Sequence, residues 1–213
     1  MKSLFLGILL IIILGFGGLV YRNAVEHPNR PIVCPMDALV CPDGTTVARA
    51  GMSCTFPVCP PPNVTLTDIG VSFAIPDGLV ASLLPDTASV AAYELQSVST
   101  TSSARIVIRR YSIASSSTAF ATIQQTAVGI TSGVPVNPAS FYSTSIGNHR
   151  FTTVTVDRFE GNIDTAFYLA RGTDVLRFDA IDSGADWTNP NLEVMTLPAH
   201  LALKKLLVTL QGR

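Results

Sequence analysis

The feature that most constrains this chain is an apolar run near its N-terminus, LFLGILLIIILGFGGLV at residues 4–20, which contains no charged or strongly polar side chain. As a helix rising about 1.5 Å per residue, the run would extend for about 25 Å, slightly less than the ~30 Å hydrocarbon core of a bilayer. Tyr21 and Arg22 follow it, where an aromatic belt and a charged stop are typical of the membrane surface. The run predicts a transmembrane helix within an anchor segment at residues 1–22.

Two alternatives for residues 4–20 stay open. The first is a cleavable signal peptide, in which the apolar stretch is usually shorter and ends at small residues; Gly15-Phe16-Gly17 is the best cleavage site available. The second is a helix buried in a protein core. An anchor and a signal peptide would both export the rest of the chain. We therefore expect a single-pass membrane protein, held in the membrane by residues 4–20, with an extracytoplasmic C-terminal domain.

Length and charge limit what the exported part can be. The chain has 213 residues, which leaves room for one domain of ordinary size beyond the anchor. Its 14 basic and 15 acidic residues give a net charge of −1, without the clustered Lys and Arg of a nucleic-acid-binding surface. Charged residues make up 14% of the chain, against about 25% in average soluble proteins. This composition favours a secreted or envelope protein and argues against a nucleic-acid partner.

Residues 23–63 contain all four cysteines and then a spacer with Pro60, Pro61 and Pro62. The cysteines follow the pattern C-x6-C-x12-C-x4-C, and they are Cys34, Cys41, Cys54 and Cys59. An even number of clustered cysteines beyond an export segment is typical of a small module held by disulfides. Two bonds are therefore expected, and three pairings are open. The alternative is a zinc site, although only Cys54 and Cys59 approach the usual ligand spacing.

The sequence VCPDGTTVARAGMSC in this segment resembles the core of Kazal-type protease inhibitors. The residues that carry the resemblance are Val40, Cys41, Asp43, Gly44, Thr45 and Cys54. Residues 41–60 also resemble a short CPDG-type motif of uncharacterised membrane-anchored envelope proteins from bacteria. The first resemblance implies protease inhibition, and the second implies a location without an activity. Pro42-Asp43-Gly44 is expected to form a turn, because proline restricts φ and glycine accepts a positive φ.

Residues 64–213 are expected to form the globular domain. Ile69, Val71, Phe73 and Ile75 alternate at the period of a β-strand. Six further runs with strand character occupy residues 91–98, 105–113, 140–146, 151–159, 164–170 and 174–181. Turn residues separate the last four runs, which predicts a meander of hairpins.

Two segments have helical patterns instead. Apolar side chains recur at Phe120, Ile123, Ala127 and Ile130 behind Thr118 or Ser117 as a candidate N-cap. Residues 198–211 begin with a proline that suits a first helical turn, and their apolar side chains, expected to pack inward, are Leu201, Leu207, Val208 and Leu210. The order of elements predicts an α+β fold, in which two helices pack on an antiparallel sheet, preceded by the transmembrane helix and the small disulfide-rich segment.

Three stretches of the domain, VSFAIPDGL, FTTVTVDRFEG and LALKKLLVTL, together with this order of elements, resemble the PsbP-like fold. Proteins with that fold include many exported accessory proteins. The resemblance implies a binding or assembly module, while a fold alone does not determine a function.

Few residues in the sequence suggest catalysis. His27 is expected in a juxtamembrane spacer, His149 in a hairpin turn, and His200 on the surface or at the cap of the last helix. The sequence lacks a Gly-x-Ser-x-Gly elbow, a His-Glu-x-x-His motif and a Gly-rich phosphate loop. We therefore predict no catalytic residue, no metal site and no cofactor, and a protein that is not an enzyme. An exported hydrolase would need His149 or His200 within reach of a carboxylate and a serine.

A polar segment near the C-terminus gathers oxygen-bearing side chains, namely Asp179, Asp182, Asp186, Asn189, Asn191 and Glu193. Because the EF-hand spacing is absent, a solvated acidic loop is expected there rather than a calcium site. Trp187, the only tryptophan, interrupts the segment. It is either a core residue under the loop or an exposed residue that contacts a partner, and it is our candidate partner contact.

Together these patterns predict a membrane-anchored, non-catalytic binding or assembly module of the cell envelope, whose partner is another envelope protein. A Kazal-like protease inhibitor and an exported hydrolase are the alternatives.

Overall fold

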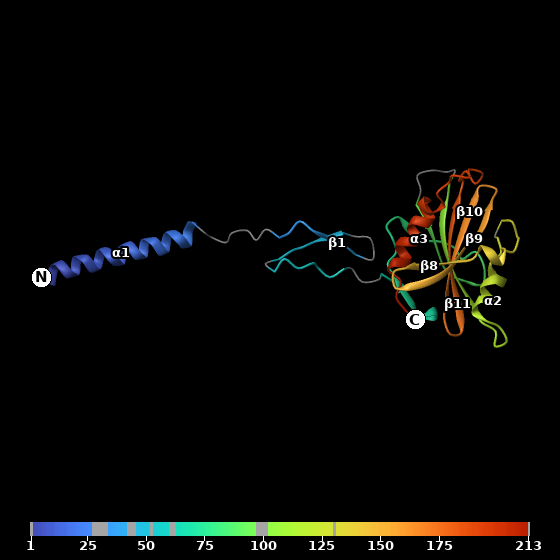
Figure 1. Ribbon diagram of the computed structural model, residues 1–213, viewed down its shortest axis with the longest axis horizontal. Helices are drawn as coiled ribbons and strands as arrows, with labels where there is room; N and C mark the ends of the chain where they lie inside the picture. Colours follow the sequence, from blue (N-terminus) through green and yellow to red (C-terminus); the bar gives the residue numbers. More distant parts are fainter. Residues whose placement is uncertain are drawn as a thin grey trace. The chain divides into compact units, whose positions relative to one another are not determined.

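The computed structural model describes residues 2–26, 34–41, 46–51, 53–59, 63–96, 102–129 and 131–212. They belong to two compact units. The first consists of Met1–Leu39 and Val47–Pro57, and the second of Val40–Thr46 and Val58–Arg213. The first unit contains helix α1, and the second contains the large sheet with helices α2 and α3 (Figure 1).

In the first unit, α1 (Lys2–Glu26) includes the whole apolar run. The structure describes the exposure of Gly7 and residues 11–22 of this helix. Among the described residues, no helix combines the length and the apolar character needed to cross a membrane. The transmembrane anchor at residues 1–22 therefore stays a prediction from the sequence.

Two disulfide bonds hold the cysteine-rich segment together, as the even number of cysteines predicts. Cys34 is bonded to Cys54 and Cys41 to Cys59. Neither bond joins Cys41 to Cys54, and all four sulfur atoms are used, so no thiolate is left for a zinc ion. Two short strands in this segment, β1 (Ala38–Val40) and β2 (Thr46–Ala48), pair with each other.

Several predictions for this part of the chain lie outside the described residues. They concern His27, the turn at Pro42-Asp43-Gly44 with Thr45, and the spacer of Pro60, Pro61 and Pro62. Of the residues that carry the Kazal-like resemblance, the structure describes Val40, Cys41 and Cys54, and the two cysteines belong to different disulfides.

The second unit is built on a seven-stranded sheet in which every neighbouring pair is antiparallel. Its strands, in spatial order, are β5 (Leu79–Ala81), β6 (Ser89–Leu95), β7 (Ala104–Ser112), β11 (Asp174–Ser183), β10 (Asn162–Ala170), β9 (His149–Phe159) and β8 (Tyr142–Ile146). The α+β fold with an antiparallel sheet is confirmed, and so is the meander from β8 to β11. Strand β7 pairs with β11, the last strand of that meander.

The strand expected at residues 69–75 is shorter than its alternation suggests. β3 (Val64–Leu66) pairs with β4 (Val71–Phe73), and a 3-10 turn, Thr67–Ile69, joins them. Gly70 ends the turn at φ +61, a conformation that L side chains rarely adopt. Ile69 belongs to the turn and not to a strand, yet its side chain is buried. The alternation of apolar residues in the sequence is therefore longer than strand β4 itself.

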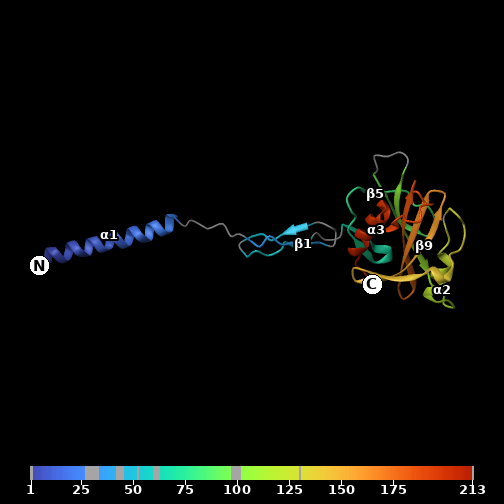
Figure 2. The ribbon, with the colours of Figure 1, turned by 45° about the horizontal axis from the view of Figure 1, so that its top comes forward.

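Helices cover both faces of the large sheet. α3 (Pro198–Val208) lies against one face and α2 (Ala119–Thr126) against the other (Figures 1 and 2). The larger core, between the sheet and α3, includes Phe151, Phe167, Phe178, Leu203 and Leu206. The smaller core, on the α2 face, includes Ile123, Val154, Tyr168 and Val175. The small core covers only part of its face, which leaves room there for a polar site.

Both helices are shorter than predicted. The Thr118 hydroxyl accepts a hydrogen bond from the Ala121 amide at 3.1 Å, which confirms the N-cap of α2. α2 ends at Thr126 because the chain then turns into a bridge between Val128 and Pro135; Ile130 lies outside the described residues.

The buried side of α3 also differs from the prediction. Leu201 and Val208 were expected to pack inward, but both are exposed. Leu207 and Leu210 are buried as expected, and the helix also buries Ala199, His200, Ala202, Leu203 and Leu206. His200 is fully buried, which corrects its predicted place on the surface or at a cap.

Candidate functional site

Charged side chains occupy the α2 face of the sheet at its centre. Arg177 and Asp179 are two residues apart on β11, so both point to the same face. Arg109 on β7 is the cross-strand neighbour of Arg177, and Asp164 lies on β10. All four residues are buried, and we call them the buried ion-pair cluster. The antiparallel register brings them together from three strands.

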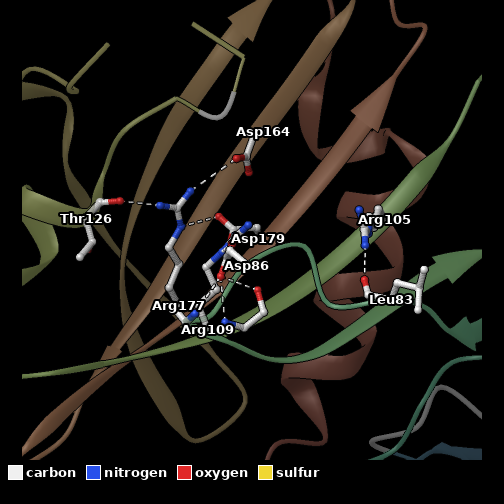
Figure 3. Close-up of polar contacts among 10 residues, drawn as sticks. Leu83, Asp86, Arg105, Arg109, Thr126, Asp164, Arg177 and Asp179 are labelled. Atoms are coloured by element: carbon white, nitrogen blue, oxygen red, sulfur yellow. Dashed lines mark hydrogen bonds and ion pairs between the residues drawn. The ribbon is translucent and has the colours of Figure 1, made fainter. Parts of the chain in front are cut away.

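Asp179 is the centre of the buried ion-pair cluster (Figure 3). It accepts hydrogen bonds from Arg109 Nη1 and, at 2.6 Å, from Arg177 Nε. Arg109 also donates through Nε to Asp86 at 2.8 Å. Arg177 donates through Nη1 to the carbonyl oxygen of Thr126, 2.5 Å away at the end of α2. The cluster thus connects the sheet to the helix that covers this face.

Opposite charges keep both guanidinium groups ionised. Burial alone would lower the pKa of Arg177, but the Asp179 carboxylate raises it above its ordinary value. The pKa of Arg109 is raised for the same reason, against the same effect of burial. Burial alone would raise the pKa of Asp86, whereas hydrogen bonds from Arg109 and Ser89 keep it below its ordinary value. These groups therefore satisfy one another electrostatically.

Asp164 differs from the rest of the cluster. Its residue is 1% exposed, Arg177 Nη2 lies 3.5 Å from Oδ2, and Oδ1 has no hydrogen-bond partner among the described residues. Burial, together with the negative charge of Asp179, raises the pKa of Asp164 well above its ordinary 3.8. A carboxyl group in this state keeps its proton over a wider pH range and can both donate and accept a hydrogen bond.

We expect the Asp164→Asn variant to gain stability relative to the unmodified protein as the pH rises. A carboxyl whose folded-state pKa is raised favours folding while it holds its proton, and that contribution is lost as the pH rises from about 3.8 through the folded-state pKa. Asparagine keeps the shape but cannot ionise. Urea unfolding at several pH values would measure the difference, with the exposed Asp77→Asn variant as control. Parallel pH profiles for Asp164→Asn and the unmodified protein would contradict the raised pKa.

A cavity of about 380 Å³ lies on the α2 face beside the buried ion-pair cluster. Apolar parts of its wall come from Val107 and Ile181. Its polar lining consists of Asp86, Ser103, Arg105, Arg109, Thr131, Asp157, Asn162 and Asp164. A volume of this size lies within the range of small-molecule binding sites, and the mostly polar lining favours a polar ligand.

Two buried polar atoms in the cavity wall have no hydrogen-bond partner among the described residues. Arg105 donates through Nη2 to the carbonyl oxygen of Leu83 (Figure 3), while its Nε has no partner within the described part of the chain. Asp164 Oδ1 is the second such atom. Asp157, in contrast, accepts hydrogen bonds at Oδ2 from the amides of Thr131 at 2.7 Å and Ser132 at 3.1 Å. Buried polar atoms in proteins are usually paired, and two of the six unpaired ones among the described residues meet in this cavity wall, which marks it as the candidate site.

The histidines lie elsewhere. His149 begins β9 beside the predicted turn, and its Nε2 is 3.0 Å from the carbonyl oxygen of Leu210. His200 is paired through Nδ1 with Asp182 Oδ2 at 2.7 Å, and both residues are buried. The hydrolase alternative also requires a serine at the other ring nitrogen, but His200 Nε2 has no hydrogen-bond partner among the residues described.

The acidic segment is not one solvated loop, which corrects the prediction. Asp179 and Asp182 belong to β11, where both are buried on opposite faces. Asp186 and Asn189 do lie in the loop, with Asp186 accepting a hydrogen bond from the Thr188 hydroxyl at 2.7 Å. In the described part of the chain, no group of three or more His, Cys, Asp or Glu residues is arranged to hold a metal ion.

Trp187 lies outside the candidate site. Its ring is partly buried and tilted against Phe159, with 5.8 Å between the ring centroids. Its carbonyl oxygen accepts a hydrogen bond from Arg158 Nε at 2.8 Å. The ring is thus neither fully enclosed nor fully exposed, and its role as a partner contact stays a prediction.

Comparison with known proteins adds little to this description. No family model matches the sequence, and no curated protein matches it either. Among solved structures, the chain is similar to a protein from Bacteroides thetaiotaomicron VPI-5482, with 12% sequence identity and a TM-score of 0.41. That match covers 67% of this chain and 45% of the other. The chain therefore spans less than half the length of that relative.

The sequence contains a signal for the buried ion-pair cluster that the strand predictions passed over. Arg177 and Asp179 alternate with Leu176, Phe178 and Ala180, so in the middle of β11 two charged side chains share one face while apolar side chains occupy the other. A strand at the edge of a sheet could have this pattern too. Only the position of β11 at the centre of the sheet makes these charges buried ones.

Proposed function

We propose that this protein is a membrane-anchored, extracytoplasmic binding module without catalytic activity, and that the cavity on the α2 face is its ligand-binding site. One observation carries the proposal for the site: two buried polar atoms, Arg105 Nε and Asp164 Oδ1, line the cavity without a partner among the described residues. An unpaired buried donor or acceptor costs about 1–3 kcal/mol, and a ligand that pairs with both atoms would recover that cost.

The pairing of the other charges supports binding rather than catalysis. Arg109, which lines the cavity, is paired with Asp86 and Asp179, and Arg177 beside it is paired with Asp179 and the Thr126 carbonyl. A rigid arrangement of charges that is already in place is a good basis for recognition, because binding then requires little reorganisation. The resemblance to the PsbP-like fold stays a prediction that agrees with this class of function.

The proposed location rests on the apolar run at residues 4–20 and on the two disulfide bonds. Disulfides persist mainly in oxidising compartments outside the cytoplasm. We expect the protein to sediment with membranes, to resist extraction by high salt, and to keep both bonds in non-reduced intact-mass spectra. Recovery in the soluble fraction with free thiols would contradict the location and leave the cavity unaffected.

The binding site is tested by screening small polar compounds for an increase in the melting temperature of the full-length chain. The Ser103→Trp variant places a large ring at the exposed edge of the cavity, and the matched Ser145→Trp variant places the same ring on the exposed edge strand β8. We expect compounds that stabilise the unmodified protein and the β8 variant but not Ser103→Trp. Equal stabilisation of all three proteins, or of none, would rule out the cavity as the binding site.

A further inference from the structure

Four residues that line the cavity form a single row across the sheet. Arg105 on β7 is opposite Ile181 on β11, Ile181 is opposite Asp164 on β10, and Asp164 is opposite Asp157 on β9. All four are part of the cavity wall. Because cross-strand neighbours point to the same face, the row presents a cation at one end, an apolar side chain next to it, and two carboxyl groups at the other end.

The spacing of strands sets the scale of this row. Neighbouring strands are about 4.8 Å apart, so the backbone positions of Arg105 and Asp164 are about 10 Å apart. Ile181 lies below the middle of that span, where a short hydrocarbon chain would pack.

Each end of the row contains a buried polar atom that has no hydrogen-bond partner among the described residues. At one end, Arg105 Nε is buried without a partner among the described residues. At the other, Asp164 Oδ1 is equally unpaired, and Asp157 contributes a second carboxyl group held by the amides of Thr131 and Ser132. The nearby guanidinium groups of Arg109 and Arg177 are already paired with carboxylates. The row therefore has one available positive group and one available acidic end.

We infer that the ligand is a small zwitterion, whose carboxylate binds Arg105 and whose ammonium group binds Asp164 beside Asp157. This inference rests on the binding function proposed above and specifies its ligand class. Linear amino acids with a few methylene groups between the two charges, and short peptides, belong to that class. A compound with only one of the two charges satisfies only one end of the row.

The test uses isothermal titration calorimetry on the full-length chain with linear ω-amino acids from glycine to 6-aminohexanoate. Each is compared with the amine and the carboxylic acid that lack one of its charges. We expect an intermediate length to bind best, and both of its singly charged analogues to bind at least about tenfold more weakly.

Two variants assign the ends of the row. Arg105→Gln should weaken the best zwitterion about tenfold and leave the affinity of its amine analogue unchanged, whereas Asp164→Asn should weaken it similarly and leave the carboxylic acid unchanged. Lys204→Gln and Asp77→Asn, which change exposed charges elsewhere, are the matched controls and should alter nothing.

The outcomes separate this inference from the proposed function. If a compound with a single charge binds as tightly as every zwitterion, and Ser103→Trp abolishes its binding, the zwitterion class is wrong and the cavity is still a binding site. If the variants at Arg105 and Asp164 bind the best zwitterion as the controls do, the assignment of the row is wrong. If neither the amino acids nor the compounds of the screen bind in a way that Ser103→Trp abolishes, both proposals fail.

Discussion

Replacing Asp179 with alanine is expected to lower the free energy of unfolding by about 3–5 kcal/mol. Asp179 is 0% exposed and accepts hydrogen bonds from both Arg109 and Arg177. Without the Asp179 carboxylate, the guanidinium groups of Arg109 and Arg177 stay buried on neighbouring strands. No negative charge between them then offsets their mutual repulsion. Removing one partner of a buried charge network costs more than removing the whole pair, because the remaining charge cannot reach water.

Urea unfolding of the full-length chain, followed by circular dichroism, measures this loss. The same substitution at exposed Asp77 is the control and should change stability by less than about 0.5 kcal/mol. The double variant Arg177→Met/Asp179→Leu removes both charges together and should recover much of the loss, because Arg109 keeps Asp86. A loss below about 1 kcal/mol for Asp179→Ala would mean that the buried charges do not depend on one another.

Truncating Phe151 to alanine is expected to cost about 3–5 kcal/mol, by leaving a hole in the core between the sheet and α3. Phe151 is 0% exposed, and its ring meets Phe167 and Phe178 edge-on, with centroid distances of 6.4 and 6.2 Å. Phe151, Phe167 and Phe178 lie on β9, β10 and β11, which are adjacent in the sheet. Because the hydrogen-bonded strands fix the backbone, the neighbours cannot move in to fill the space.

The matched control is Phe120→Ala, since Phe120 is 47% exposed and also meets another ring, Phe141, at 5.8 Å. The Phe120→Ala variant should lose less than about 1.5 kcal/mol of unfolding free energy, which is the contribution of one aromatic contact. Thermal unfolding of both variants beside the unmodified protein gives the comparison. Equal losses for the two variants would contradict the placement of Phe151 at the centre of the core.

Local signals in the sequence predict much of the fold. Turn residues at Gly147, Glu160 and Gly161 separate the strands of the meander, and each of these three has a positive φ in the structure. The alternation of apolar residues predicts the strands, and the Thr118 cap predicts the start of α2. These features depend on residues close together in the chain, so a short stretch of sequence contains the information.

The burial of individual residues on the helices was predicted less well, because burial depends on neighbours that are distant in sequence. Leu201 and Val208 fit an apolar pattern but lie on the exposed side of α3, while His200 is buried beside Asp182. A histidine becomes a suitable core residue only when a carboxylate from another strand meets its ring. The sequence around His200 contains no trace of that partner.

The candidate site shows the same limit more strongly. Asp157, Asp164 and Arg105 are ordinary charged residues of three separate strand patterns. Their grouping in one row depends on β7 pairing with β11, a contact between segments about seventy residues apart.

By itself, the sequence determined the even set of disulfide-forming cysteines, the α+β class and the antiparallel meander. Each of these follows from composition or from periodicity within a short window. Only the tertiary structure decided which cysteines pair, which charges are buried and where the cavity lies. The physical reason is that a strand's register and its central or edge position come from distant partners, and these decide whether a charged side chain meets water, an opposite charge or a ligand.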